Sequence, residues 1–253
     1  MYQEILSLNI FAFLLIFVRI GAFFSVAPGF SGSQISLRIR LATALAFTFV
    51  LTPTLMDTLP RVPESALSLA ALILGEFVIG VLIGTVGRIL FSAVHVAASI
   101  TSFVSAMANA MIADPISQQQ SAIVASFLSV LVTVLLFVTN LHHVMLQAMI
   151  DSYTLFQPGV LPPVGDMSEL ISRHVAGAFK LGVQLASPMI IIAFAYYLGL
   201  GILTRLEPNI PIFFVGMPLQ IVLGITALMI TISSISLYFL DRFERGMQPF
   251  LIS

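Results

Sequence analysis

Residues 67–112 read LSLAALILGEFVIGVLIGTVGRILFSAVHVAASITSFVSAMANAMI, a nearly continuous apolar stretch with only two charged residues, Glu76 and Arg88. A helix needs about 20 apolar residues to cross a bilayer, so this stretch is more than twice the length of one span. We divide it into two predicted segments at Arg88. No obvious turn separates them, and the alternative is a pair of long helices that does not cross a bilayer in the simple way.

The composition of the whole chain indicates a helical integral membrane protein. Hydrophobic residues make up 59% of the chain and charged residues 8%, and the mean hydropathy is +1.10. A soluble domain carries about 25% charged residues, so this chain has too few to cover a wet surface. An outer-membrane barrel would instead show short alternating strands with turn signals.

Charge, cysteine and motif content exclude several classes of function. The net charge is -1 and there is no basic tract, so neither nucleic acid nor anionic lipid headgroups are expected as specific ligands. The chain has no cysteine, which excludes disulfides and thiolate metal sites. His142 and His143 are adjacent rather than four residues apart, which argues against a helical metal site. We expect no catalytic residues, no enzyme activity, no cofactor and no metal.

Seven apolar segments are predicted along the chain, and a mixed link at 142–169 separates the fifth from the sixth. The segments are 5–30, 41–55, 66–87, 89–112, 122–141, 170–203 and 211–240. If each crosses once, one membrane face collects most of the arginines, namely Arg38, Arg40, Arg88, Arg173, Arg242 and Arg245, against Arg61 and Arg205 at the other. That face should be cytoplasmic, which predicts an external N-terminus and a cytoplasmic C-terminus.

The stretch MANAMIADPISQQQ, residues 107–120, is a polar break between two apolar runs. Lipid cannot satisfy exposed backbone groups, so a broken segment at membrane depth must face protein or water. This loop is therefore a candidate for lining or blocking a passage. An ordinary turn outside the membrane is an equally good interpretation of the residues alone.

Three charged residues lie within apolar runs: Arg19, Glu76 and Arg88. A lone charge at bilayer depth costs several kcal/mol, so each is expected to have a partner, and Arg19 with Glu76 is one possible pair. We favour a structural or assembly role over a proton or ion relay, because relays need more acidic groups in series.

Glycines in the third predicted segment indicate close helix packing. Gly80 and Gly84 form a GxxxG motif, and Gly75 precedes it. Small residues let helix backbones approach each other closely in lipid. The contact is either internal to the chain or with another subunit.

An ordered set of short motifs, spread over nearly the whole chain, resembles the FliR family of type III secretion export gates. The motifs are Arg19-Ile-Gly21, Ala27-Pro-Gly-Phe30, Leu37-Arg-Ile-Arg40, Gly75-Glu-Phe-Val-Ile-Gly80, Ala108-Asn-Ala110, Asp114-Pro115, Gln119-Gln120, Pro188, Leu198-Gly199, Arg205, Pro208, Asn209 and Val215-Gly-Met-Pro-Leu219. Virulence relatives share much of this pattern. The flagellar members match better, mainly at Asp114-Pro115 and Gln119-Gln120.

The resemblance implies an all-α polytopic membrane protein of long helical hairpins that joins a helical multi-subunit gate. Residues 1–169 would be the FliP-like part and 170–253 the FliQ-like hairpin with the C-terminal tail. The implied partners are FliP-like and FliQ-like subunits, FlhB-like and FlhA-like export components, membrane lipid and unfolded protein substrates. The implied location is the flagellar basal body in the bacterial inner membrane.

The resemblance also implies that residues 107–120 project into the pore and help to plug its closed state. In that role Met107, Met111 and Ile112 would form the apolar seal, since methionine packs flexibly. Asp114 before Pro115 would break the helix. The other polar members of the loop, which would satisfy backbone groups without fixing a charge in the channel, are Asn109, Gln118, Gln119 and Gln120. Relatives often have glycine where this chain has Gln118.

Two other functions fit parts of the sequence. One is the homologous gate subunit of a virulence type III secretion system. The other is a secondary transporter with a broken-helix site near Asp114, although transporters usually show matched broken helices in two halves. A membrane scaffold without a pore is a third class.

Overall fold

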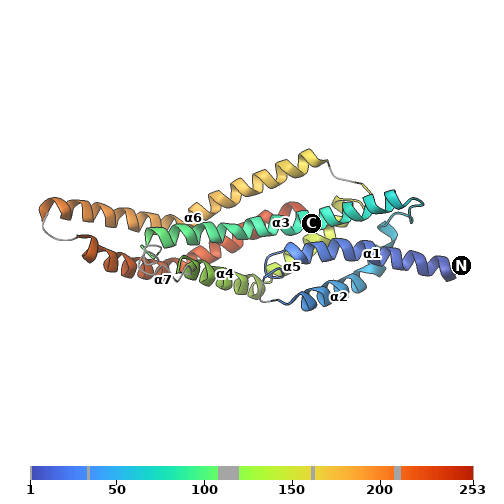
Figure 1. Cartoon of the computed structure of the whole chain (residues 1–253), viewed down its shortest axis with the longest axis horizontal. Coiled ribbons are helices and arrows are strands. Elements are labelled where there is room, and N and C mark those ends of the chain that lie inside the picture. The colour runs from blue at the N-terminus through green and yellow to red at the C-terminus, as the bar shows by residue number, and fades with distance from the viewer. Residues whose placement is uncertain (1, 33–34, 108–119, 161–162, 208–211, 253) are drawn as a thin grey trace. The chain divides into compact units, whose positions relative to one another are not determined.

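The computed structural model describes residues 2–32, 35–107, 120–160, 163–207 and 212–252, and every regular element in these ranges is a helix (Figure 1). In chain order the elements are α1 (Tyr2–Val26), α2 (Leu37–Leu55), η1 (Met56–Thr58), α3 (Ala66–Val104), α4 (Gln120–Val138), α5 (Leu141–Leu155), α6 (Val164–Leu206), α7 (Ile212–Met247) and η3 (Gln248–Phe250). The prediction of an all-α polytopic membrane protein is confirmed.

The helices pack into two compact units that do not follow the order of the chain. Unit 1 contains Met1–Leu90, Thr139–Val175 and Phe243–Ser253, and unit 2 contains Phe91–Val138 and Ala176–Arg242. Helices α3, α6 and α7 each contribute one part to unit 1 and another to unit 2. These units describe packing, and the division into FliP-like and FliQ-like parts stays a prediction.

Helix α3 is one continuous helix of 39 residues, so the predicted division at Arg88 is wrong. Arg88 is exposed and leaves the helix intact. Gly87 also lies inside the helix, where it lets the Pro28 ring pack closely, since a Cβ on Gly87 would lie 3.2 Å from Pro28 Cδ. The orientation derived from seven single crossings loses its basis, since Arg88 does not lie in a link between two spans.

Residues 141–155 form a helix where the sequence predicted the beginning of a mixed link. Asn140, in the left-handed conformation at φ 60°, separates α4 from α5. Asparagine adopts this conformation more readily than most residues. Helices α6 and α7 are also longer than predicted, beginning at Val164 and ending at Met247.

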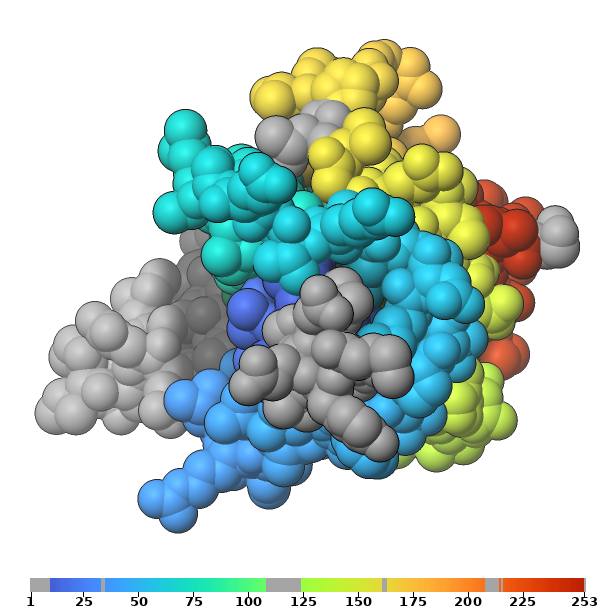
Figure 2. Space-filling view, turned by 90° about the vertical axis from the view of Figure 1, so that its right-hand side faces the viewer, coloured from blue at the N-terminus to red at the C-terminus, as the bar shows by residue number. Residues whose placement is uncertain are grey.

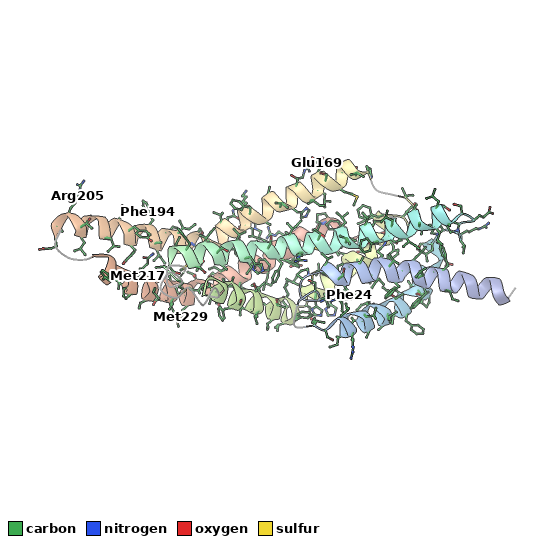
Figure 3. All side chains as sticks on the ribbon, viewed as in Figure 1. Phe24, Glu169, Phe194, Arg205, Met217 and Met229 are labelled. Carbon is green, nitrogen blue, oxygen red and sulfur yellow. The ribbon has the colours of Figure 1, made fainter. Side chains whose placement is uncertain are left out.

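Within the residues that the structure describes, four helices are long and apolar enough to cross a membrane, and the pair α4–α5, if counted as one span, is a candidate for a fifth. Their outward faces are strongly apolar. Phe194 on α6 is 65% exposed and Met229 on α7 is 73% exposed, and both side chains point away from the hairpin (Figure 3). Such surfaces are stable only against lipid or other subunits.

The core of unit 1 is built on α1. Its fully buried residues Leu15, Ile16, Ile20 and Phe23 lie on one face at helical spacing. The buried residues of the other helices in unit 1 include Ile79, Ile83, Val86, Met145, Met149, Tyr153, Phe243 and Met247. One charged residue, Arg19, lies on the buried face of α1, and it organises the candidate site.

Candidate functional site

Arg19 and Glu76 form a buried ion pair between α1 and α3. Arg19 is 0% exposed and Glu76 is 1% exposed. The Arg19 Nε donates to Glu76 Oε2 at 2.6 Å, and Arg19 Nη2 donates to Oε1 at 3.0 Å. Two parallel hydrogen bonds match the planar guanidinium to the carboxylate and fix their relative orientation. The structure thus brings together two of the three charges that the sequence singled out.

Helix α5 supplies the remaining partners of Arg19. Arg19 Nη1 donates to the Ser152 carbonyl oxygen at 3.1 Å and to Ser152 Oγ at 3.2 Å, and Nη2 donates to the Phe156 carbonyl oxygen at 3.1 Å. The Tyr153 ring lies 4.0 Å from the guanidinium carbon, a cation–π contact. A guanidinium has five N–H donors, and five acceptor contacts surround this one. This arrangement joins three helices and leaves no donor available to a substrate.

Two hollows lie near this network, at the end of unit 1 that carries the start of α3. One, of about 280 Å³, is lined by α3 residues including Gly75 and Glu76 and by Gly159 and Val160. The other, of about 420 Å³, is lined by residues after α2 and by the end of α5, including Tyr153. Figure 2 shows the start of α3 (cyan) beside the segment after α5 (yellow). Among the described residues that line the first hollow, Glu76 is the only ionisable one.

The GxxxG glycines bring α1 and α3 close enough for the ion pair to form. A Cβ on Gly80 would overlap the Arg19 carbonyl oxygen and lie 2.9 Å from Ala22 Cβ. A Cβ on Gly84 would lie 3.0 Å from the Phe23 carbonyl oxygen. Both glycines therefore serve a contact inside the chain. Gly80 lies one turn after Glu76, so the closest approach of the two backbones is beside the pair.

We expect Gly80→Ala to destabilise the chain by about 1–3 kcal/mol, the usual cost of overpacking a tight contact. The added methyl group would push α1 from α3 and stretch the Arg19–Glu76 hydrogen bonds. Thermal unfolding of the purified chain in detergent measures the change. Gly177→Ala on α6 is the matched control, because a Cβ there meets no atom of the part of the chain that the structure describes within 4 Å. This variant should gain up to about 1 kcal/mol of helix propensity. Equal melting temperatures for the two variants would contradict this packing role.

The other predicted site residues are placed as follows. Arg88 is exposed on α3 and lies outside the Arg19 network. Met107 lies half-buried in the turn after α3, and Gln120 begins α4. The other members of the predicted plug lie outside the residues that the structure describes, namely Asn109, Met111, Ile112, Asp114, Pro115, Gln118 and Gln119.

The contribution of α5 to this site was not predicted from the sequence. A helical signal was present, because Leu141, Met145, Met149 and Ser152 repeat at intervals of three or four residues and are all buried. The polar residues His142, His143, Gln147 and Asp151 lie between them and gave the segment the composition of a link.

Comparison with known proteins identifies the family. The family model described as bacterial export proteins, family 1, matches residues 10–246. The flagellar biosynthetic protein FliR of Caulobacter vibrioides is 33% identical over 244 residues, covering 96% of this chain and 97% of that protein. The proteins of the same name from Bacillus subtilis and Escherichia coli are each 27% identical, over 88% and 83% of this chain and 87% and 79% of their own lengths. The chain therefore belongs to the bacterial export proteins, family 1, the family of the flagellar biosynthetic proteins FliR.

Proposed function

We propose that this chain is a subunit of the flagellar type III secretion export gate and forms part of the pore through which unfolded flagellar proteins cross the inner membrane. The observation that carries the proposal is the family match from residue 10 to 246, nearly the whole chain. The relatives reported above bear a flagellar name, which favours the flagellar system over a virulence system. The four or five long apolar helices among the described residues suit a membrane component of such an apparatus.

The proposed partners are FliP-like and FliQ-like subunits, with FlhB-like and FlhA-like components beside them. Glycines on α6 support a shared interface. A Cβ added at Gly177, Gly199 or Gly201 meets no atom of the described residues within 4 Å. Glycine inside a helix costs about 1 kcal/mol relative to alanine, and close approach of a neighbouring helix is what such a residue allows in a membrane.

Within this gate we propose that residues 107–120 help to close the pore. The described residues on either side of this segment suit that role. A turn at residues 105–107 follows the end of α3, and helix α4 begins at Gln120. The Arg19–Glu76 network supports a structural role for the buried charges in assembly. All of the guanidinium donors are in contact with acceptors, and a relay needs further acidic groups in series.

Deleting the gene in its own bacterium tests the proposal. We expect a strain that makes no filament and secretes no hook or filament protein, with export restored by the tagged chain in trans. The tagged chain should also copurify with FliP-like and FliQ-like subunits. Normal secretion in the deletion strain would refute the proposal. Purification as a homo-oligomer that transports a small solute would point to a secondary transporter instead.

A further inference from the structure

The C-terminal end of α3 is held from a distant part of the chain by Gln220 on α7. Gln220 is 8% exposed, and its Nε2 donates to the Val104 carbonyl oxygen at 2.8 Å and to the Tyr197 hydroxyl oxygen at 2.8 Å. Val104 is the last residue of α3, and the last carbonyls of a helix have no partner within it. Because the amide nitrogen has two hydrogens, Gln220 uses both donors to join α3, α6 and α7.

Gly224, one turn further along α7, allows the two backbones to touch. A Cβ on Gly224 would overlap Ser105 Cβ and lie 3.3 Å from Ser105 Cα. The space left around this contact is about 10 Å³, at the lower limit for a single water molecule. The contact between α7 and the end of α3 is therefore direct and closely packed.

Ala106 turns the chain sharply just beyond this contact. Its φ is 59°, in the left-handed region, and it is buried. A residue with a Cβ adopts this conformation at a cost in free energy and keeps it only where its surroundings enforce it. The neighbouring Ser105 packed on Gly224 supplies such surroundings, so the direction in which the chain leaves α3 is set by tertiary packing.

The adjacent residues Tyr196 and Tyr197 on α6 hold α6 and α7 in register, which keeps Gln220 opposite the end of α3. The Tyr196 hydroxyl donates to the Gly216 carbonyl oxygen at 2.5 Å, while Tyr197 accepts from Gln220. The hairpin is thus joined across its two helices at Gln220 and one turn before it, at Gly216. Movement of α6 against α7 would be transmitted to the end of α3.

We propose that these six residues, which we name the α3 anchor, fix the direction in which the chain enters residues 108–119. The residues are Val104, Ser105, Ala106, Tyr197, Gln220 and Gly224. Gln220 is the principal positioning residue. Gly224 lets α7 pack closely enough for Gln220 to reach the Val104 carbonyl oxygen. The importance of the anchor for pore closure rests on the proposed function of residues 107–120. The proposal that the anchor sets the direction of the chain after α3 does not depend on that function.

A single introduced thiol tests the anchor in the full chain within its own membrane. The chain has no cysteine, so Met107→Cys provides one defined site for a maleimide, in the turn after Ala106. We expect Gln220→Leu, which removes both hydrogen bonds of Gln220, to raise the labelling rate at least about fivefold, the factor that corresponds to each buried hydrogen bond lost. Gly224→Ala, whose added Cβ overlaps Ser105, should raise the rate by a similar factor. Tyr197→Phe, which removes only the accepting hydroxyl, should raise it less.

Matched controls separate the anchor from general damage. Gln184→Leu removes an exposed amide that accepts from Tyr238 at 3.2 Å, and Gly165→Ala adds a methyl group that meets no described atom within 4 Å. Both should label at the unchanged rate. Equal labelling rates of the anchor variants and the controls, at normal abundance, would overturn the proposal. If Gln220→Leu and Gly224→Ala fail to accumulate, the labelling rate of Tyr197→Phe against the controls gives the answer.

Leakage of the resting membrane distinguishes the anchor from the pore plug. If replacing the loop causes a leak and Gln220→Leu causes a smaller one, the anchor positions the loop for closure. If replacing the loop causes a leak while Gln220→Leu labels faster without any leak, the role in closure is refuted. If replacing the loop causes no leak, the proposed plug is wrong, while the labelling rates still decide whether the anchor sets the direction of the chain.

Discussion

Replacing Glu76 by alanine is expected to remove most of the folded chain from the membrane. Arg19 would keep its charge at 0% exposure while losing both carboxylate hydrogen bonds. Breaking one side of a buried ion pair costs about 3–5 kcal/mol, because the remaining charge stays uncompensated. That is a large part of the stability of an ordinary domain. Immunoblotting of the tagged chain, and its yield in the copurified complex, measure the loss.

Glu169→Ala is the matched control for Glu76→Ala. Glu169 also pairs with an arginine, Arg173, but the side chains are 61% and 77% exposed. Exposed pairs contribute about 0–1 kcal/mol, so this variant should accumulate normally. Equal abundance of the two alanine variants would contradict a structural role for the buried pair.

The double variant Arg19→Met with Glu76→Leu separates a structural pair from a relay. Removing both charges together leaves no buried ion, and such replacements are often nearly neutral. We expect the double variant to accumulate better than Glu76→Ala and to restore at least part of export. A double variant that assembles fully and exports nothing would show that the charges act in transport.

The pairing in this site was accessible to sequence reasoning only in part. Lone charges within apolar runs predict buried partners, and the structure brings Arg19 and Glu76 together. The contribution of the Ser152 and Phe156 carbonyl oxygens was not predictable from those runs, because backbone acceptors carry no signal in the identity of their residues. The periodicity of the buried residues in α5 was visible, but its polar face obscured it.

The length of α3 shows where hydropathy alone misleads. A charge after a glycine, at Gly87 and Arg88, suggested a boundary between two spans. In the structure the helix is continuous through both residues, with the Pro28 ring packed beside Gly87 and the Arg88 side chain exposed. Both facts depend on tertiary packing, which a hydropathy pattern does not contain. The all-α class was predictable because it rests on summed composition rather than on one boundary.

Deleting residues 110–118 is expected to leave the gate assembled and to make the resting membrane leaky to ions and small molecules. The deletion removes the proposed apolar seal, Met111 and Ile112, and the proposed bend at Asp114 and Pro115. A closed state favoured by a few kcal/mol leaves the open state populated at about 0.1–10%. Loss of the seal should therefore raise permeability about tenfold to a thousandfold, measured with a membrane-potential dye.

A length-preserving replacement makes this test independent of strain in the shortened link. Substituting residues 110–118 by nine glycine and serine residues keeps the reach between the α3 anchor and α4 and removes the side chains that would form the seal. We expect a leak from this variant as well. In cells that lack the FliP-like partners neither variant should leak, because the pore would be absent. A leak that persists in the cells without those partners would arise outside the gate. Unchanged permeability in fully assembled complexes would refute the plug, because a pore wide enough for an unfolded chain conducts ions unless something closes it.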